Sequence, residues 1–213
     1  TVISEFPDFV WHEEELFSPY SIGQNWFGEL VSAEDKELSL VFVFPNLVKN
    51  KALRVKSQVL GRTKNDKMYF DAWVNDNHVA VNTSINTISG KDHYYGWPSA
   101  FDKQIMLDSD TAVFQLTCDA DKKTFLYLDY VEIYGWRQLK RTNDNFLFRL
   151  MPSQFGNDRS AVWVQNVSAD YWLWEVTSPL QPVLQDAVLS ANNLVFATNE
   201  RTEKRYVLFK HEA

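Results

Sequence analysis

The stretch Phe125-Leu-Tyr-Leu-Asp-Tyr-Val-Glu-Ile133 decides the fold of this chain of 213 residues. Its aromatic and β-branched residues favour extended backbone, and in a strand alternate residues lie on opposite faces. Asp129 and Glu132 would then point outward or pair with Arg137, and we read Asp129 as a structural residue. The segments Leu126, Leu128, Tyr130 and Val131 to Ile133 would put alternate residues into the core of a β-sandwich.

Similar runs occur along most of the chain, whereas no segment keeps the three- and four-residue apolar spacing of a helix over about ten positions. Glycine is scarce, with seven in the chain. We therefore expect Asn and Asp, as in Asn65-Asp66 and Asn75-Asp-Asn77, to form the turns, because their short side chains tolerate left-handed backbone. The expected strands are residues 38–44, 53–60, 69–74, 78–81, 112–117, 125–133, 145–150, 161–165, 171–176, 193–197 and 205–209.

These runs predict an all-β protein with a polar connector at Arg141-Thr-Asn-Asp144. We expect a jelly-roll-like, galactose-binding-like β-sandwich over residues 1–140, with a smaller antiparallel β unit over residues 141–213 packed on it. The aromatic residues of Thr1 to Tyr20 favour an extended strand pinned to the sandwich over a free arm. Three aromatic residues are read as core anchors, namely Trp26, Phe27 and Trp174.

The formal net charge is −7 at pH 7, the pI is near 5.1, and no basic stripe follows the chain. Nucleic acid is therefore not an expected partner. The longest apolar stretch, residues 38–48, is interrupted by Ser39, Pro45 and Asn46 and is too short to insert into a membrane. The first residues are neither an initiator methionine nor an export signal, so we expect a processed protein or a piece of a longer one.

No group of residues predicts catalysis. A nucleophilic Cys118 would need a histidine base, but it is followed by the turn Asp119-Ala-Asp-Lys122 and by no feature that lowers a thiol pKa. The chain has no Gly-x-Ser-x-Gly motif, and its histidines lack metal-ligand spacing. We assign neither a catalytic residue nor a metal ligand. Calcium remains open as a cofactor through aspartates near turns: Asp66, Asp71, Asp76, Asp119 and Asp121.

The best candidates for a binding loop lie in His93-Tyr-Tyr-Gly-Trp-Pro98. Tyr94, Tyr95 and Trp97 could stack on sugar rings, as exposed aromatic residues do. The same rings could instead fold down and cap one end of the sandwich, and we favour this capping interpretation. If the rings are exposed, the chain would be a stand-alone carbohydrate-binding module of the galactose-binding type.

Several segments, taken in order, resemble the region upstream of the peptidase domain in gingipain-like cysteine peptidases, with the type IX secretion system sortase as the nearest subgroup. Four positions depart from the family pattern: Glu175 follows Trp174 in place of Asp, Ser178 replaces Asn or Asp, and Lys204-Arg205 replaces Arg-Glu. The similar segments are Ile22-Gly-Gln-Asn-Trp-Phe-Gly-Glu-Leu30, Phe125 to Ile133 with Arg137-Gln-Leu139, Leu173-Trp-Glu-Val-Thr-Ser-Pro-Leu-Gln-Pro182, and Arg205-Tyr-Val-Leu-Phe209.

The resemblance implies a non-catalytic β portion of a larger exported protein of Bacteroidetes, in the periplasm or at the cell surface. In the family the catalytic histidine and cysteine come from the domain that follows, and no residue of this chain matches their motifs. The implied role is to support that downstream peptidase domain, or to dock secreted-protein substrates by strand addition or in side-chain pockets. Glycans are the partners in the rival carbohydrate-binding hypothesis.

Overall fold

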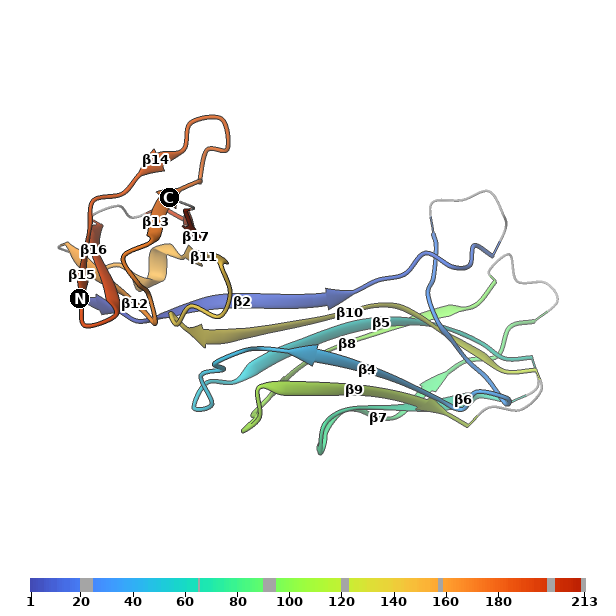
Figure 1. Ribbon diagram of the computed structural model, residues 1–213. Coiled ribbons are helices and arrows are strands. Elements are labelled where there is room, and N and C mark those ends of the chain that lie inside the picture. Colours follow the sequence, from blue (N-terminus) through green and yellow to red (C-terminus); the bar gives the residue numbers. More distant parts are fainter. Residues whose placement is uncertain are drawn as a thin grey trace. The chain divides into compact units, whose positions relative to one another are not determined.

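The computed structural model describes residues 1–19, 25–64, 66–89, 95–119, 123–156, 159–198 and 202–211. The protein is all-β, as predicted, and its strands divide between two compact units (Figure 1). The large unit comprises Phe9–Phe44 and Lys49–Tyr134, and the small unit comprises Thr1–Asp8, Pro45–Val48 and Gly135–Ala213. These units are discontinuous in sequence, so a single division at residue 140 stays a prediction.

The large unit is built from two sheets. One sheet has the order β4 (Glu37–Val43), β9 (Thr111–Cys118), β6 (Met68–Val74) and β7 (Asn77–Ile85). The other has the order β2 (Glu5–His12), β10 (Phe125–Gln138), β5 (Leu53–Arg62) and β8 (Trp97–Ile105), and β3 (Leu30–Val31) also pairs with β10. Strands β2 and β10 contribute residues to both units.

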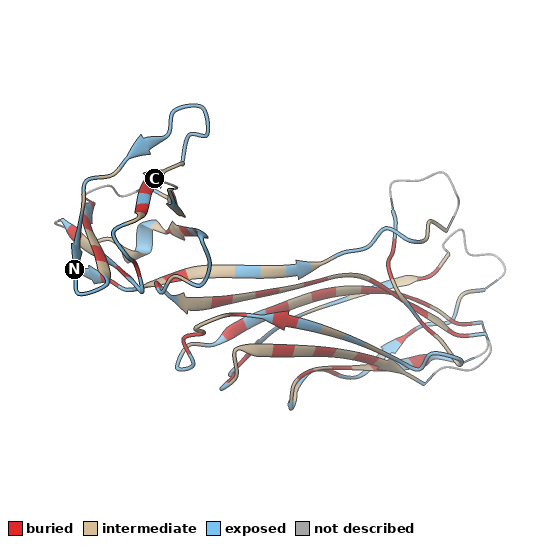
Figure 2. Cartoon of the chain, viewed as in Figure 1, coloured by how far each residue is buried: buried red, intermediate tan, exposed pale blue. Residues whose placement is uncertain are grey.

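Alternating burial explains why these segments are strands, and the alternation is visible along β5 and β10 in Figure 2. On β6, Met68, Phe70, Ala72 and Val74 are all buried, and the residues between them are not. Each inward side chain packs into a shared apolar core, whose burial from water is the main stabilising contribution. Gly61 on β5 is required there, because a Cβ atom would lie 2.2 Å from Cδ1 of Ile85.

The small unit also has two sheets, with the 3₁₀ turn Pro152–Gln154 between β11 and β12. Their inner faces share one core, in which Phe6 contacts Phe146 and Phe148 contacts Tyr206. The pairing of β1 with β12 is parallel, whereas the strand pairings within residues 141–213 are antiparallel. The sheets have the orders β1 (Val2–Ile3), β12 (Ser160–Gln165), β16 (Asn193–Thr198), β15 (Ala187–Ser190), and β11 (Asn145–Leu150), β17 (Lys204–Lys210), β13 (Tyr171–Glu175), β14 (Val183–Leu184).

Every run expected to be extended overlaps a strand, and the strand expected near the N-terminus is β2. Asp129 and Glu132 point outward, the first of the two alternatives, because Arg137 pairs with Asp8 at 2.6 Å and donates to the carbonyl of Pro45. Two details were wrong. Trp26 is not a core anchor, because 42% of its surface is exposed, whereas Phe27 is buried. Tyr130 is only half-buried, because a β-bulge at Asp129 shifts the alternation.

The expected use of asparagine in turns is confirmed. Among the described residues, six that are not glycine have a positive φ, and five of those six are asparagines. Asn75, with φ of 51°, starts the turn from β6 to β7, and its side chain bonds to the backbone of Thr111 and Val113. Asn65 lies outside the described residues. In the part of the chain that the structure describes, no helix is long and apolar enough to cross a membrane.

Candidate functional site

A row of aromatic side chains lies on the sheet formed by β2, β10, β5 and β8. On β5, the residues Leu53, Val55 and Val59 are buried in the core, so the residues between them lie on the opposite face of the sheet. We call this the outer face, and define it by Phe9, Trp11, Arg54, Lys56, Gln58, Asp102, Asp129, Tyr130, Glu132 and Tyr134.

Phe9, Trp11 and Tyr134 form a stack on the outer face. The ring centroids of Phe9 and Trp11 are 5.4 Å apart with an interplanar angle of 24°. Phe9 also stacks on Tyr134, with the ring centroids 5.8 Å apart and an interplanar angle of 20°. Phe9 is the middle ring, so Trp11 has one side covered and remains 61% exposed. The stack therefore presents an indole surface to solvent.

The register of β10 and β5 places polar residues beside the stack. Tyr134 is opposite Arg54, and Glu132 is opposite Lys56. The hydroxyl of Tyr134 donates to a carboxylate oxygen of Glu132 at 2.7 Å, and Nζ of Lys56 lies 5.4 Å from the Tyr134 ring centroid. Acidic, basic and aromatic groups thus meet within one small area.

A bidentate ion pair continues this polar area onto β8. Nε of Arg54 donates to Oδ1 of Asp102 at 2.8 Å, and Nη2 donates to Oδ2 at 2.5 Å. The two side chains are 52% and 46% exposed, so their remaining hydrogen-bonding capacity is accessible from solvent. Hydrogen bonding to Arg54 lowers the pKa of Asp102, which is therefore ionised at neutral pH.

Acidic groups dominate the electrostatics around Tyr130. Burial raises the pKa of its phenol, and the negative charges of nearby carboxylates raise it further. Burial also raises the pKa of Asp129, although a hydrogen bond from Gln58 acts in the opposite direction. The outer face is thus an aromatic and mainly acidic surface. The carboxylates that raise the pKa of Tyr130 are those of Glu132, Asp129, Asp102 and Glu13.

The structure places two of the three residues expected to form a binding loop. Tyr94 lies outside the described residues, as does His93. Trp97 was expected in a loop, but it is the first residue of β8, and its indole N–H donates to the carbonyl of Thr87 at 3.3 Å. Tyr95 precedes β8 and is half-buried.

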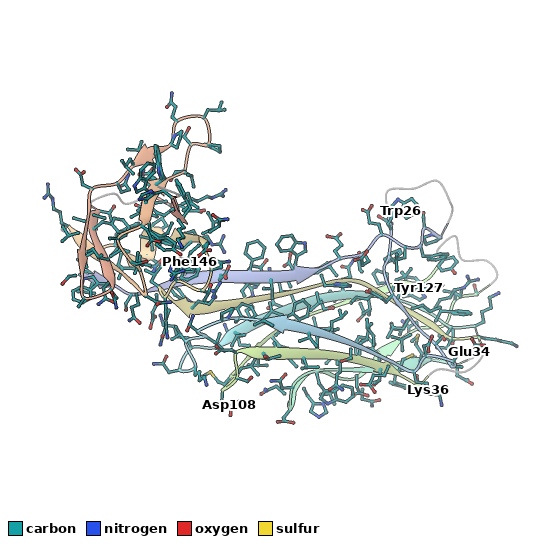
Figure 3. All side chains as sticks on the ribbon, in the orientation of Figure 1. Trp26, Glu34, Lys36, Asp108, Tyr127 and Phe146 are labelled. Carbon is teal, nitrogen blue, oxygen red and sulfur yellow. The ribbon has the colours of Figure 1, made fainter. Side chains whose placement is uncertain are left out.

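Tyr95 packs against aromatic residues at one end of the large unit. Its ring centroid is 5.4 Å from that of Phe17. Phe17 in turn stacks on Tyr127, which is labelled in Figure 3, with ring centroids 4.7 Å apart and an interplanar angle of 10°. The guanidinium of Arg62 lies 4.1 Å above the Tyr95 ring. This packing fits the capping interpretation for Tyr95, and ligand binding by Tyr94, Tyr95 and Trp97 stays a prediction.

Cys118 ends strand β9 and is partly buried. Burial raises the pKa of its thiol to about 12, and the neighbouring carboxylate of Asp119 adds to the effect. A thiol with so high a pKa stays protonated at neutral pH and is a poor nucleophile. This environment supports the structural reading of Cys118.

The histidines that the structure describes are engaged elsewhere. Nε2 of His12 is 2.5 Å from Oε1 of Glu29, and Nε2 of His78 accepts from the indole N–H of Trp73 at 3.0 Å. The ring of His211 stacks on Trp172 at 4.6 Å. Each of these contacts lies on a different pair of elements, so they form no shared site.

Two of the aspartates considered for calcium bond to the backbone. Asp71 accepts from the backbone N–H of Asn82 at 2.8 Å, and Asp119 accepts from that of Tyr69 at 2.6 Å. Among the described residues, no three His, Cys, Asp or Glu side chains are grouped so that they could hold a metal ion. Asp121 lies outside the described residues, and calcium binding stays a prediction.

A pocket of about 360 Å³ lies beside the turn between β6 and β7. It is lined by Asn75 and Asn77 of the turn and by Met106 and Asp108, the last of which is labelled in Figure 3. Asn75 and Asn77 use their amide groups to bond to nearby carbonyl groups, including that of Met106. The polar lining therefore stabilises the turn.

Sequence reasoning missed the aromatic stack of the outer face. Phe9 and Trp11 are two residues apart, and this spacing puts both on one side of an extended strand. That signal was available in the sequence, but both rings were assigned to pinning the strand. Their stacking on Tyr134 depends on the pairing of β2 with β10, which the sequence alone does not give.

Comparison with solved structures relates the whole fold to one known protein. The chain is similar to PorU from Porphyromonas gingivalis, in a crystal structure of its dimeric latent form, with a TM-score of 0.78 and 13% sequence identity. The similarity covers 98% of this chain and 20% of the PorU chain, so the present chain spans about a fifth of that protein's length. At this identity, the likeness shows a shared fold.

The other comparisons add little. A family-36 carbohydrate-binding domain of a xylanase from the hindgut metagenome of Trinervitermes trinervoides has a TM-score of 0.36 and 12% identity, covering 60% of this chain and 95% of that domain. So low a score supports no argument about function. No protein-family model matches the sequence, and no curated protein sequence matches it.

Proposed function

We propose that this chain is the non-catalytic β portion of a larger exported protease or sortase of the PorU and gingipain-like type. Its role is to support the catalytic domain that follows or to dock protein substrates. In this role the protein works in the periplasm or at the cell surface. The observation that carries the proposal is the likeness to PorU across 98% of the chain, which includes both compact units.

The extent of that likeness favours this proposal over a stand-alone carbohydrate-binding module. A single jelly-roll sandwich would account for the large unit alone, and the small unit would need a separate explanation. The ordered sequence motifs point the same way, because one lies in β10 and two lie in the small unit, in β13 and β17.

The small unit also offers a surface suited to a neighbouring domain. We name it the apolar rim, defined by Leu180, Val183, Leu184, Val188 and Leu189. Leu180 is 94% exposed and Val188 is 70% exposed, and residues 178–190 contain one charged side chain, that of Asp186. Five exposed apolar side chains within ten residues of sequence make this segment a candidate interface. The downstream peptidase domain is the partner we assign to it.

Reading the gene beyond the codon for residue 213 tests the proposal. We expect the frame to continue into a domain that carries a catalytic histidine and cysteine. A stop codon directly after residue 213 would contradict the proposal and leave the carbohydrate-binding hypothesis ahead.

The docking role of the apolar rim has its own test. The chain and the separately expressed downstream domain are mixed and their affinity is measured by calorimetry. Val188→Asp should weaken binding by at least about tenfold, because it places an unpaired charge in an apolar interface. Val41→Asp is the matched control, since Val41 is 64% exposed in the large unit, and it should bind as the parent chain does. Equal affinities of Val188→Asp and Val41→Asp for the downstream domain would show that the apolar rim does not bind it.

A further inference from the structure

The outer face of the large unit combines three features that a sugar ring requires. It has an exposed aromatic surface on Trp11, hydrogen-bonding side chains beside it, and a rigid position on paired strands. From this combination we propose that the outer face is a binding site for a neutral polysaccharide, with Trp11 as the stacking platform. This site is distinct from the one predicted at Tyr94, Tyr95 and Trp97.

The aromatic stack gives the platform its position. Phe9 supports one side of the Trp11 indole at 5.4 Å, and Tyr134 supports Phe9 from the adjacent strand at 5.8 Å. Such support fixes the orientation of the indole, so little side-chain freedom is lost when a ligand binds. The C–H groups of a pyranose ring carry partial positive charge, and the face of an indole is electron-rich. Stacking of the two is therefore favourable.

The neighbouring polar groups can form hydrogen bonds with sugar hydroxyls. A hydroxyl group both donates and accepts, so it is matched by a pairing of cation and carboxylate. Such pairings are present: Arg54 bonds to Asp102, and Lys56 lies opposite Glu132 in the register of β5 and β10. Gln58 adds an amide that already bonds to Asp129 at 2.6 Å.

Charge selects a neutral sugar over an acidic one. On the outer face the three carboxylates of Asp102, Asp129 and Glu132 outnumber the two cations of Arg54 and Lys56, and the chain as a whole has a formal charge of −7 at pH 7. An anionic polysaccharide would be repelled by these groups, at a cost that grows as salt is reduced. The same negative charges would repel the phosphates of nucleic acid, whose bases could otherwise stack on an indole.

Affinity electrophoresis of the full 213-residue chain tests the proposal. The chain is run in native gels that contain galactomannan, xylan or β-glucan, with polygalacturonate as the anionic counterpart and an empty gel as reference. We expect retardation by at least one neutral polysaccharide and none by polygalacturonate. Trp11→Ala should lower the affinity at least about tenfold, and Trp11→Phe should keep much of it because a stacking face remains.

Trp172→Ala is the matched control. Trp172 is 46% exposed on strand β13 and is stacked on His211, and it belongs to the small unit, whereas the outer-face residues belong to the large unit. Its loss should leave retardation unchanged. Circular dichroism checks that each variant is folded, which is expected because both indoles are exposed.

Three results would overturn the proposal. The first is the absence of retardation by any of the neutral polysaccharides. The second is an equal effect of Trp11→Ala and Trp172→Ala, and the third is retardation by polygalacturonate alone. Each result is independent of whether a peptidase domain follows the chain, so this site can fail while the proposed function stands.

Discussion

The carboxylate of Asp129 accepts a hydrogen bond at 2.6 Å from Nε2 of Gln58, at the point where β10 has one residue more than β5. Leu128 pairs with Val59, and Tyr130 pairs with Gln58, so Asp129 is the extra residue of a β-bulge. The bulge reverses the face to which each following residue of β10 points. Val131 and Ile133 therefore enter the core, and Tyr134 lies in the aromatic stack. The outer face therefore depends on this bulge.

The first prediction concerns Asp129→Asn and the pH. Burial raises the pKa of Asp129 in the folded protein, so ionisation of the carboxyl group costs stability as the pH rises through that raised value. The asparagine variant keeps an acceptor for Gln58 and never ionises. Its free energy of unfolding, relative to the parent chain, should therefore increase between about pH 3 and about pH 7. Urea denaturation at several pH values measures this.

Asp102→Asn is the control for that series. The pKa of Asp102 is lowered by its hydrogen bond to Arg54, so the ionised form is favoured in the folded state. The relative stability of Asp102→Asn should fall or stay level over the same pH range. Parallel pH profiles for the two variants would contradict the assignment for Asp129.

The second prediction compares two phenylalanines of β2. Phe6 is buried in the core of the small unit, 5.7 Å from Phe146 and edge-on to it, whereas Phe9 is 38% exposed. Phe6→Ala should lower the free energy of unfolding by about 3 to 5 kcal/mol because it leaves a cavity. Phe9→Ala should cost about 1 to 2 kcal/mol through lost ring contacts. Similar losses in thermal or urea unfolding would refute the assigned burial.

The third prediction concerns the turn at Asn75. Its φ of 51° is unfavourable for most residues, and its side chain accepts from the N–H of Val113 at 2.7 Å and donates to the carbonyl of Thr111 at 3.0 Å. Asn75→Gly loses these bonds but keeps the backbone conformation, and should cost about 1 to 2 kcal/mol. Asn75→Ala adds about 1 kcal/mol of backbone strain. Denaturant titration of both variants should find alanine the less stable.

The fourth prediction concerns the reactivity of Cys118. With its pKa raised to about 12, the thiol should react with iodoacetamide at about pH 8 much more slowly than an unfolded cysteine does. The same reaction in urea supplies the reference rate, and mass spectrometry counts the label. Native labelling as fast as that in urea would mean that the thiol is open to solvent and ionised.

Much of the fold follows from alternating apolar residues, and the exceptions have physical causes. The sequence does not predict β8, because its outward positions include Pro98, Asp102 and Gln104 and it lies at the end of its sheet. An edge strand with few buried residues has little apolar pattern. The short strands β1, β3 and β14 have two residues each, too few for any periodicity to appear.

The proposed binding surface was harder to predict than the fold. Sequence reasoning picks out aromatic residues next to glycine and proline, as in Tyr94 to Trp97, and Tyr95 proves to be packed against Phe17. Whether a ring is exposed depends on partners far away in sequence. Phe9 and Tyr134, for example, meet because β2 and β10 share a sheet.

The central proposal is that this chain recognises other molecules without forming or breaking a covalent bond in them. The most direct measurement is hydrolysis of a random fluorogenic peptide library by the purified 213-residue chain. The predicted result is a rate equal to that of buffer, for both the parent chain and Cys118→Ala. Cleavage by the parent chain that disappears in Cys118→Ala would contradict the account, because it would make the thiol a nucleophile.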